Sequence, residues 1–172
     1  MTTLPRRKPS RRRRSRHSPA AAPDALREAF WKHVPLDRMT KAEWEALCDG
    51  CGRCCLNKLE DADSGAVAYT RVACRLLDGD SCRCGNYALR KVLVPECVVL
   101  TPANIGQIAY WMPPTCAYRL LWEGADLPDW HPLVSGDPDS VHRAGISVRG
   151  QTVPEYEVPE TEWEDHIVEL DG

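Results

Sequence analysis

Alternating polar and apolar residues mark one segment of the chain as β-structure. Between positions 56 and 77, apolar side chains recur at about every second residue, the spacing that lines one face of a strand. The small polar residues Asp61–Gly65 interrupt this pattern and predict a turn between two strands. A second turn is expected at Asp78–Asp80, and a further strand from Gly145 to about Val153.

Short helices are expected on both sides of these strands. Thr40 and Glu43 fit a capping box, so a helix is predicted from Lys41 to about Leu47, with Trp44 and Leu47 on its inner face. The other predicted helices are Ala25 to about His33 with Asp24 as N-cap, Tyr87–Val92, Pro102 to about Trp111, Cys116–Glu123 with Thr115 as cap, Ser140–Arg143, and an amphipathic segment, Glu160–Leu170. Helices and strands mix without a βαβ rhythm, which predicts a small, irregular single domain of the α+β class.

The composition leaves little material for an apolar core. Leu, Ile, Val and Phe make up just under a fifth of the 172 residues, while the chain has 6 Trp and 9 Cys. So low a fraction indicates disorder only when net charge is high, and here it is -3. We therefore expect a folded domain over residues 24–172, with a thin core supplemented by a covalent or metallic cross-link.

The first 23 residues are a low-complexity segment rich in Arg, Ser, Pro and Ala, which predicts a disordered arm. Its basic residues are Arg6, Arg7, Lys8, Arg11, Arg12, Arg13, Arg14 and Arg16, and it has no acidic residue. Such a cluster can bind nucleic acid through its phosphates. The rest of the chain is acidic and offers no basic face to cooperate with the arm, which favours a solvated tail.

The paired arginines could begin a twin-arginine export signal, but such a signal needs an apolar stretch after them. The segment Ser18–Asp24 that follows is short and polar, and no run in the chain approaches the length of a membrane span. We therefore expect a cytoplasmic protein without a membrane partner. Cytosolic thiols stay reduced, and a closed disulfide framework would leave one of the nine cysteines unpaired.

Four of the nine cysteines fall within eight residues. Cys48-x-x-Cys51-Gly52 has the spacing of a tight turn that points two sulfurs at one spot, as in zinc knuckles and iron–sulfur sites. Adding Cys54 gives the first three ligands of a bacterial ferredoxin run, although the usual fourth is missing and Cys55 follows at once. In an extended segment neighbouring side chains point to opposite sides, so Cys54 and Cys55 are not expected to share one mononuclear site.

The other five cysteines form looser groups. Cys82 and Cys84 are expected on one face of a strand or turn, with Cys74 nearby. Eight of the nine thiols would satisfy two tetrahedral sites, and four would hold one cubane cluster. All nine are candidate metal ligands: Cys48, Cys51, Cys54, Cys55, Cys74, Cys82, Cys84, Cys97 and Cys116.

A thiol-rich set of this kind suits soft metals and excludes magnesium and calcium. The expected cofactor is an iron–sulfur cluster or zinc, and the spacing does not decide between them. Buried free cysteines are common singly, but they do not account for four in eight residues. A reactive dithiol needs the pair at the start of a helix, whereas the predicted helix ends at Cys48.

Other candidate chemistry is sparse. His131 could serve as a metal ligand, but a lone histidine in a loop is more often structural, and His142 and His166 are expected to be exposed. The chain has no glycine-rich phosphate loop and no assignable Ser/His/Asp triad, so no catalytic residue is predicted.

Six segments together carry a resemblance to known proteins: Thr40–Leu56, Val72–Arg75, Cys82–Tyr87, Thr115–Leu121, Asp126–Leu133 and Ile146–Arg149. They resemble the YcgN proteins, members of the wider YkgJ, or CxxCxxCC, cysteine-cluster family. The likeness covers residues 28–169 and leaves the arm 1–23 outside it.

The resemblance implies chelation of zinc or iron. The wider family motif maps onto Cys48, Cys51, Cys54, Cys55, Cys74, Cys84 and Cys97, and the narrower YcgN pattern adds Cys82 and Cys116. Some proteins with a similar cluster are flagellin lysine methylases, in which the cluster is associated with iron–sulfur binding. This chain is shorter and has no separate segment able to hold a methyl donor, so that activity is not carried over.

Three functions therefore remain open. The first is a metal-binding domain, and the second is a redox or methyl-transfer enzyme with Trp111, Tyr118, Trp130 and His131 around its substrate. The third is an adaptor that binds nucleic acid or protein through the basic arm. Ligand count separates the first two, because four thiolates close a metal site whereas three with an open position permit chemistry.

Overall fold

The central strand of the fold is β2, Val67–Ala73, with which three other strands pair. β1, Leu56–Glu60, lies antiparallel to one edge of β2. β3, Val153–Pro154, is parallel to β2, and β4, Ile167–Val168, is antiparallel to it. The predicted hairpin between β1 and β2 is confirmed, including its turn, which Gly65 closes by donating to the Asp61 carbonyl at 2.8 Å.

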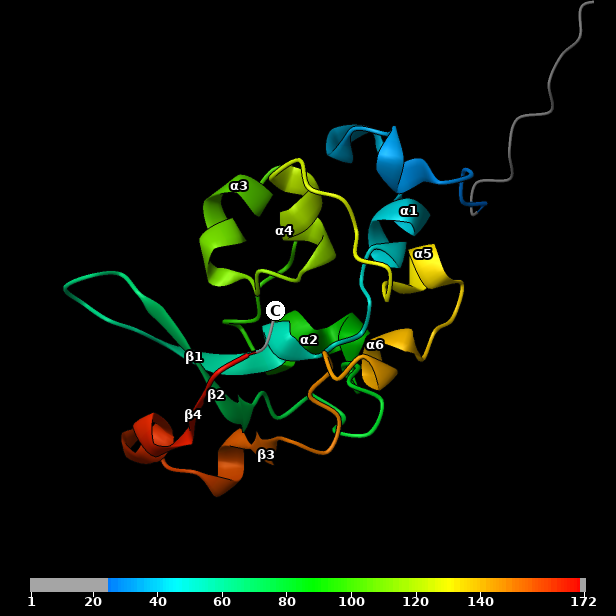
Figure 1. Cartoon of the computed structure of the whole chain (residues 1–172). Helices are drawn as coiled ribbons and strands as arrows, with labels where there is room; N and C mark the ends of the chain where they lie inside the picture. The colour runs from blue at the N-terminus through cyan, green and yellow to red at the C-terminus, as the bar shows by residue number, and fades with distance from the viewer. Residues whose placement is uncertain (1–24, 171–172) are drawn as a thin grey trace, which may run out of the picture.

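Short helices make up most of the remaining regular structure in the computed structural model, which describes residues 25–170. The α-helices are α1 Lys41–Ala46, α2 Arg90–Leu93, α3 Ile105–Ile108, α4 Ala117–Trp122, α5 Pro132–Ser135 and α6 Ser140–Arg143. The 3-10 helices are η1 Phe30–Lys32, η2 Leu36–Arg38, η3 Arg53–Cys55, η4 Tyr87–Leu89, η5 Ala109–Trp111, η6 Glu155–Glu157 and η7 Glu160–His166. In Figure 1, α3 and α4 lie above the sheet, and α5 lies beside α1. The small, irregular α+β class is confirmed.

Two of the predicted helices differ in type. The first is only the 3-10 turn η1, because Ala29 just before it has a left-handed backbone with φ of 44°. Its predicted N-cap, Asp24, lies outside the described residues. The C-terminal helix is the 3-10 segment η7 followed by β4, since the free edge of β2 takes up Ile167 and Val168 as a strand.

Other predictions are corrected in their bounds. The helix expected from Pro102 to Trp111 is divided into α3 and η5, and Cys116 rather than Thr115 is the N-cap of α4. The strand predicted from Gly145 to Val153 is wrong except for its last residue. Most of that stretch forms turns, and the Val148 N–H donates to the Cys51 carbonyl at 2.9 Å instead of to a strand. α5 lies in a region predicted as loop.

The start of α1 is fixed as the sequence predicts. Thr40 Oγ1 accepts from the Glu43 N–H at 3.2 Å, and Glu43 Oε2 accepts from the Thr40 N–H at 2.9 Å, so the capping box is complete. Trp44 and Leu47 are both buried on the inner face. The helix therefore delivers a fixed chain direction into the first cysteine.

The Glu43 carboxylate is also held by Arg27, whose Nε donates at 2.7 Å. This hydrogen bond, with support from the Thr40 amide, lowers the pKa of Glu43 from 4.5 to about 2. The folded state therefore prefers the ionised form more strongly than the unfolded chain does.

We expect the folded state to lose the stability that this interaction contributes over a defined acidic pH range. Its contribution is complete above pH 4.5 and is lost as the pH falls towards 2. Thermal unfolding of the wild type and of Glu43→Gln should differ by a constant amount above pH 5, and the difference should shrink towards pH 2. A difference that stays constant down to pH 2 would contradict the assignment.

The apolar interior consists of three small clusters rather than one core. The largest lies among the helices and contains Phe30, Val34, Trp44, Leu47, Ile105, Ala117, Tyr118 and Leu127. The others are Leu56, Ala73, Cys82 and Val148, and Cys51, Val141 and Ile146. Two of the three clusters include a cysteine, so the apolar interior meets the cysteine-rich segment directly.

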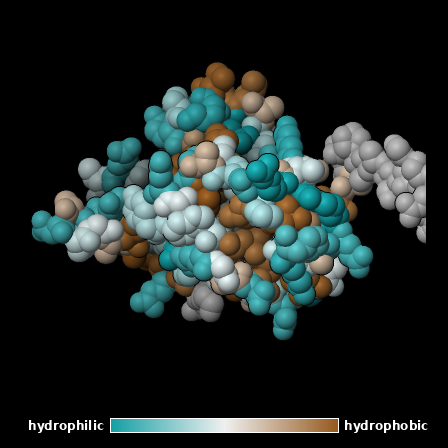
Figure 2. All heavy atoms as spheres, turned by 90° about the horizontal axis from the view of Figure 1, so that it is seen from above, coloured by the Kyte–Doolittle hydropathy of each residue, from teal (hydrophilic) through white to brown (hydrophobic). Residues whose placement is uncertain are grey.

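Polar and apolar side chains alternate over the surface seen in Figure 2, with apolar atoms exposed near its middle. No helix within residues 25–170 is long and apolar enough to cross a membrane. The basic arm 1–23 lies outside the described residues, as does the domain boundary predicted at residue 24.

Candidate metal centre

The first cysteines lie in a tight loop that follows α1, here called the cysteine loop (residues 47–55). Two glycines shape it, since Gly50 and Gly52 have φ of 80° and 77°, values that side chains with a Cβ rarely adopt. A Cβ on Gly52 would stand 2.8 Å from Val148 Cγ2, and one on Gly50 would stand 2.8 Å from Arg83 Nη2. The loop is thus packed between two other segments and cannot expand.

Cys54 and Cys55 close the loop in the 3-10 turn η3. The prediction that these neighbours point apart assumed extended backbone, and that premise is wrong. In the 3-10 turn their sulfurs lie 4.0 Å apart. Two thiolates on one tetrahedral zinc, each at about 2.3 Å, would be about 3.8 Å apart. The turn therefore places the two sulfurs at a distance at which they can bind either one shared metal or two neighbouring metals.

Backbone hydrogen bonds bring the next cysteines to the same place. The Cys74 N–H donates to the Cys55 carbonyl at 2.9 Å, which extends the β1–β2 pairing by one step. Cys84 forms an isolated antiparallel bridge with Leu77, three residues after Cys74. Cys97 follows α2, and Cys116 caps the start of α4.

One cavity of about 460 Å³ joins all of these segments. Its wall includes every cysteine of the chain: Cys48, Cys51, Cys54, Cys55, Cys74, Cys82, Cys84, Cys97 and Cys116. Within residues 25–170, no three Cys, His, Asp or Glu side chains are close enough together to enclose a single ion. The sulfurs are therefore spread over the wall of a space larger than one ion requires.

Most of these thiols resist ionisation. Burial raises the pKa of Cys48 to about 11 and of Cys116 to about 12. Cys54 is the exception, because hydrogen bonding by Cys55 and then the positive charge of Lys58 lower its pKa to about 7. Packed thiols of this kind ionise together only when cations compensate their charge, which bound metal ions do.

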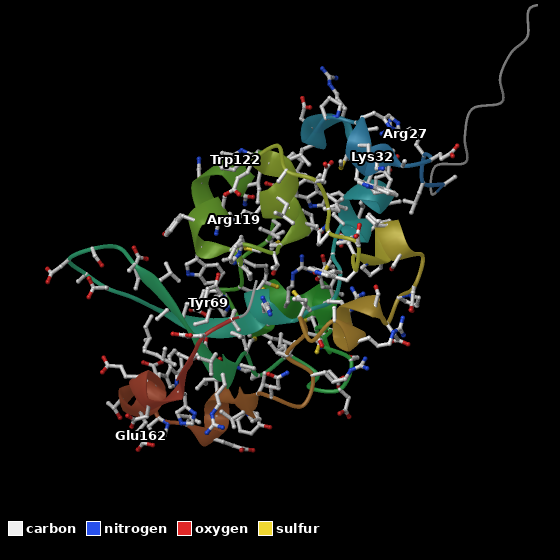
Figure 3. All side chains as sticks on the ribbon, in the orientation of Figure 1. Arg27, Lys32, Tyr69, Arg119, Trp122 and Glu162 are labelled. Carbon is white, nitrogen blue, oxygen red and sulfur yellow. The ribbon has the colours of Figure 1, made fainter. Side chains whose placement is uncertain are left out.

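Lys58 is the cation nearest the end of the cysteine loop. Its Nζ donates to the carbonyls of Cys54 at 3.2 Å and Leu56 at 2.7 Å. It lies 3.6 Å from the centre of the Trp111 ring and 5.0 Å from that of Tyr69. Figure 3 labels Tyr69 on β2, and its hydroxyl donates to the Trp111 carbonyl at 2.9 Å. The lysine thus ties η3 to β2 and η5.

The thiols form two groups that are in contact with each other. Cys54 interacts with Cys48, Cys51 and Cys116, and we call these four the loop group. Cys84 interacts with Cys55, Cys74 and Cys97, and we call these four the strand group. Cys54 also interacts with Cys55 and Cys97 of the strand group. The adjacent sulfurs of Cys54 and Cys55 lie where the two groups meet.

Cys82 belongs to neither group. It is buried in the apolar cluster with Leu56 and Val148, and the side chain and charge that act on it most directly are those of Ser147 and Arg149. Its backbone has a left-handed φ of 55°, which turns it away from the direction expected for a strand. Cys82 and Cys84 line the same cavity, and that they act together as metal ligands stays a prediction.

His131 has a structural role, as expected for a single histidine in a loop. It is fully buried, its Nδ1 accepts from the Leu133 N–H at 3.1 Å, and its Nε2 contacts the Leu47 carbonyl at 3.1 Å. Both ring nitrogens are used, so neither is free for a metal. His142 and His166 are half-buried rather than exposed, with Ser147 and Arg71 as their partners.

Of the four residues expected around a substrate, only Tyr118 lines the cavity. Trp44 and Tyr87 supply the other aromatic surface there, and Arg83 and Arg90 also reach the wall. Sequence reasoning missed Asp49 and Arg53, both buried within the cysteine loop. The sequence did carry a signal for these two residues: they are charged, whereas the rest of residues 48–55 are cysteines and glycines.

Comparison with known proteins agrees with this geometry. A profile named CxxCxxCC, described as a "Putative zinc- or iron-chelating domain", matches residues 47–117. A UPF0260 protein of Rhodobacter capsulatus is 64% identical to the chain, over 84% of the chain and 96% of its own length. The chain belongs to the UPF0260 family. The family membership inferred from the six segments is confirmed, and the matched part contains every cysteine of this UPF0260 chain.

Further UPF0260 relatives are similar over the same extent. One from Azotobacter vinelandii is 59% identical over 82% of the chain and 94% of its own length. One from Allorhizobium ampelinum is 60% identical over 81% of the chain and 87% of its own length. No solved structure matches the chain significantly.

Proposed function

We propose that residues 24–172 form a metal-binding domain whose cavity holds iron as an iron–sulfur cluster. The observation that carries this proposal is that all nine cysteines, drawn from segments far apart in the sequence, line one cavity. Thiols are the ligands that soft metals prefer, so the donor set fits both iron–sulfur and zinc.

The spread of the sulfurs favours a cluster over a lone ion. A single zinc needs four donors around one point, whereas each cysteine of a cubane binds a different iron and the sulfurs stand further apart. The cavity is wide, and no three donors among the described residues converge on a point. A polynuclear group fits such a wall better than one ion does.

The proposed ligands are the loop group, Cys48, Cys51, Cys54 and Cys116, and the strand group, Cys55, Cys74, Cys84 and Cys97. Cys82 is left out because Arg149 and Ser147, rather than other thiols, are the groups that act on it. Eight thiols suffice for two four-ligand centres. When bound, such a group supplies electron transfer and a cross-link between distant segments. The residues of the chain supply its ligands, the burial around it and the nearby positive charge of Lys58.

Metal analysis of the untagged protein, purified without air, tests this function. We expect a brown protein that contains iron and acid-labile sulfide, with visible absorption that disappears on chelation. A colourless protein with one or two zinc ions would reject the cluster and keep the metal-binding domain. A folded protein with no metal would reject both. The adaptor role of the basic arm stays a prediction, as does a cluster-dependent enzyme.

A further inference from the structure

One buried oxygen in the cysteine cavity has no partner. Asp49 lies in the cysteine loop, lines the cavity, and is only 6% exposed. Its Oδ1 accepts from the Cys51 N–H at 2.9 Å. Its Oδ2 has no hydrogen bond, and no other buried side-chain oxygen or nitrogen within residues 25–170 is left in this state. Buried polar groups are nearly always bonded, so this oxygen requires a partner that the polypeptide does not supply.

The groups around Asp49 do not neutralise it. No salt bridge in the described part of the chain involves Asp49. The buried guanidinium of Arg53 is directed to the Ile146 carbonyl and to Thr115 Oγ1 instead. His131 is bonded to backbone, and His142 to Ser147. An ionised carboxylate buried without a counter-charge is strongly unfavourable, so a cation in the cavity would stabilise it.

The thiols of the loop group are within electrostatic reach of this carboxylate. Burial and then the negative charge of Asp49 raise the pKa of the Cys51 thiol, and the same charge acts on Cys48 and Cys54. Asp49, Cys48, Cys51 and Cys54 all line the same cavity, and the Cys51 N–H holds the carboxylate within the loop that carries these thiols.

We propose that Asp49 is an oxygen ligand, through Oδ2, of the metal centre that Cys48, Cys51 and Cys54 hold. The inference rests on the proposed function and adds to it a donor that is not a thiol. A carboxylate is a harder ligand than a thiolate and binds soft metals less firmly. Among the ligands of the loop-group centre, the Asp49 oxygen is therefore the one that an incoming thiol or anion can replace most easily. The strand group has four thiols and no such oxygen.

Asp49→Asn isolates the ligating oxygen. The amide keeps an oxygen that can accept from the Cys51 N–H, but it removes the negative charge. Co²⁺ is the probe, added without air to metal-free full-length protein, because its visible absorption reports thiolate ligands. We expect at least about tenfold weaker Co²⁺ binding at one site, comparable to the loss of a supporting metal-site residue. Asp63→Asn, in the exposed β1–β2 turn, is the matched control and should bind Co²⁺ as the wild type does.

The metal-free variants separate a ligand from a structural residue. Asp49→Asn should be as stable as the wild type without metal, or more stable, because a buried charge is gone. Asp49→Cys should retain Co²⁺ and absorb more strongly, because a thiolate replaces the carboxylate. Unchanged Co²⁺ affinity in Asp49→Asn would overturn the assignment, and so would a loss of stability without metal. If Cys51→Ser abolishes Co²⁺ binding while Asp49→Asn does not, only the Asp49 assignment fails. If the folded wild type binds no Co²⁺, the proposed function fails and this ligand with it.

Discussion

Replacing Cys51 by serine is expected to remove metal from the loop group and to lower the stability of the domain to about that of the metal-free protein. Cys51 is buried, its carbonyl holds Val148, and its thiol belongs to the loop group. Metal binding contributes about 10–16 kcal/mol in zinc-finger peptides. Whole domains are stable by only about 5–15 kcal/mol. With the apolar interior divided into three small clusters, little else can compensate.

The matched control for this variant is Cys82→Ser. Cys82 is equally buried but packs with Leu56 and Val148, and Ser147 lies beside it. We expect normal metal content and a loss of about 1–3 kcal/mol from burying a hydroxyl. Metal analysis and thermal unfolding by circular dichroism measure both variants. A folded, metal-free Cys51→Ser protein with the stability of the wild type would disprove the structural role of the metal.

Arg53→Ala is expected to destabilise the domain by about 2–5 kcal/mol. The Arg53 side chain is buried, with Nε donating to the Ile146 carbonyl at 2.6 Å and Nη1 to Thr115 Oγ1 at 3.3 Å. Truncation leaves both acceptors without this donor, each at about 1–3 kcal/mol, and opens a space beside the cysteine loop. No carboxylate pairs with Arg53 in the part of the chain that the structure covers.

Two controls show which property of Arg53 matters. Arg53→Met keeps most of the volume and removes the charge and donors, so it should lie between the wild type and Arg53→Ala. Arg38→Ala removes an exposed guanidinium, 78% exposed, and should change stability by less than about 0.5 kcal/mol. Urea unfolding with and without metal measures all three. If Arg53→Met matches the wild type in both forms, the buried guanidinium has no stabilising role.

Local signals in the sequence predicted local structure well. The capping box at Thr40 and Glu43 fixed the start of α1, because both partners lie within one turn of helix. The turn at Asp61–Gly65 identified the hairpin, and α6 has the predicted bounds. The cysteine spacing marked the segment around which the cavity forms, since all nine cysteines line that cavity, while metal binding by these thiols stays a prediction.

The failures concern contacts between distant residues. β3 and β4 are two-residue strands that exist because β2 offers them an edge, and nothing within four residues of sequence specifies them. In a segment of only a few residues, the apolar positions of a 3-10 helix and of an α-helix nearly coincide. The 3-10 helix η7 was therefore predicted as an α-helix. The orientation of Cys55 was predicted for extended backbone, whereas Arg53–Cys55 form the 3-10 turn η3. The orphaned oxygen of Asp49 becomes visible only when the side chains around the cavity are in place.

The hydrogen bonds that reach the cysteine loop from later in the chain bear on how this motif could be transplanted. Val148 and Ile146 bond to Cys51 and Arg53, and His131 contacts the carbonyl of Leu47. All three lie beyond residue 117, outside the stretch matched by the CxxCxxCC profile. Grafting residues 47–117 onto another scaffold would therefore transfer the candidate ligands without the residues that hold the cysteine loop in place. The geometry of the cysteine loop therefore depends on nearly the whole domain.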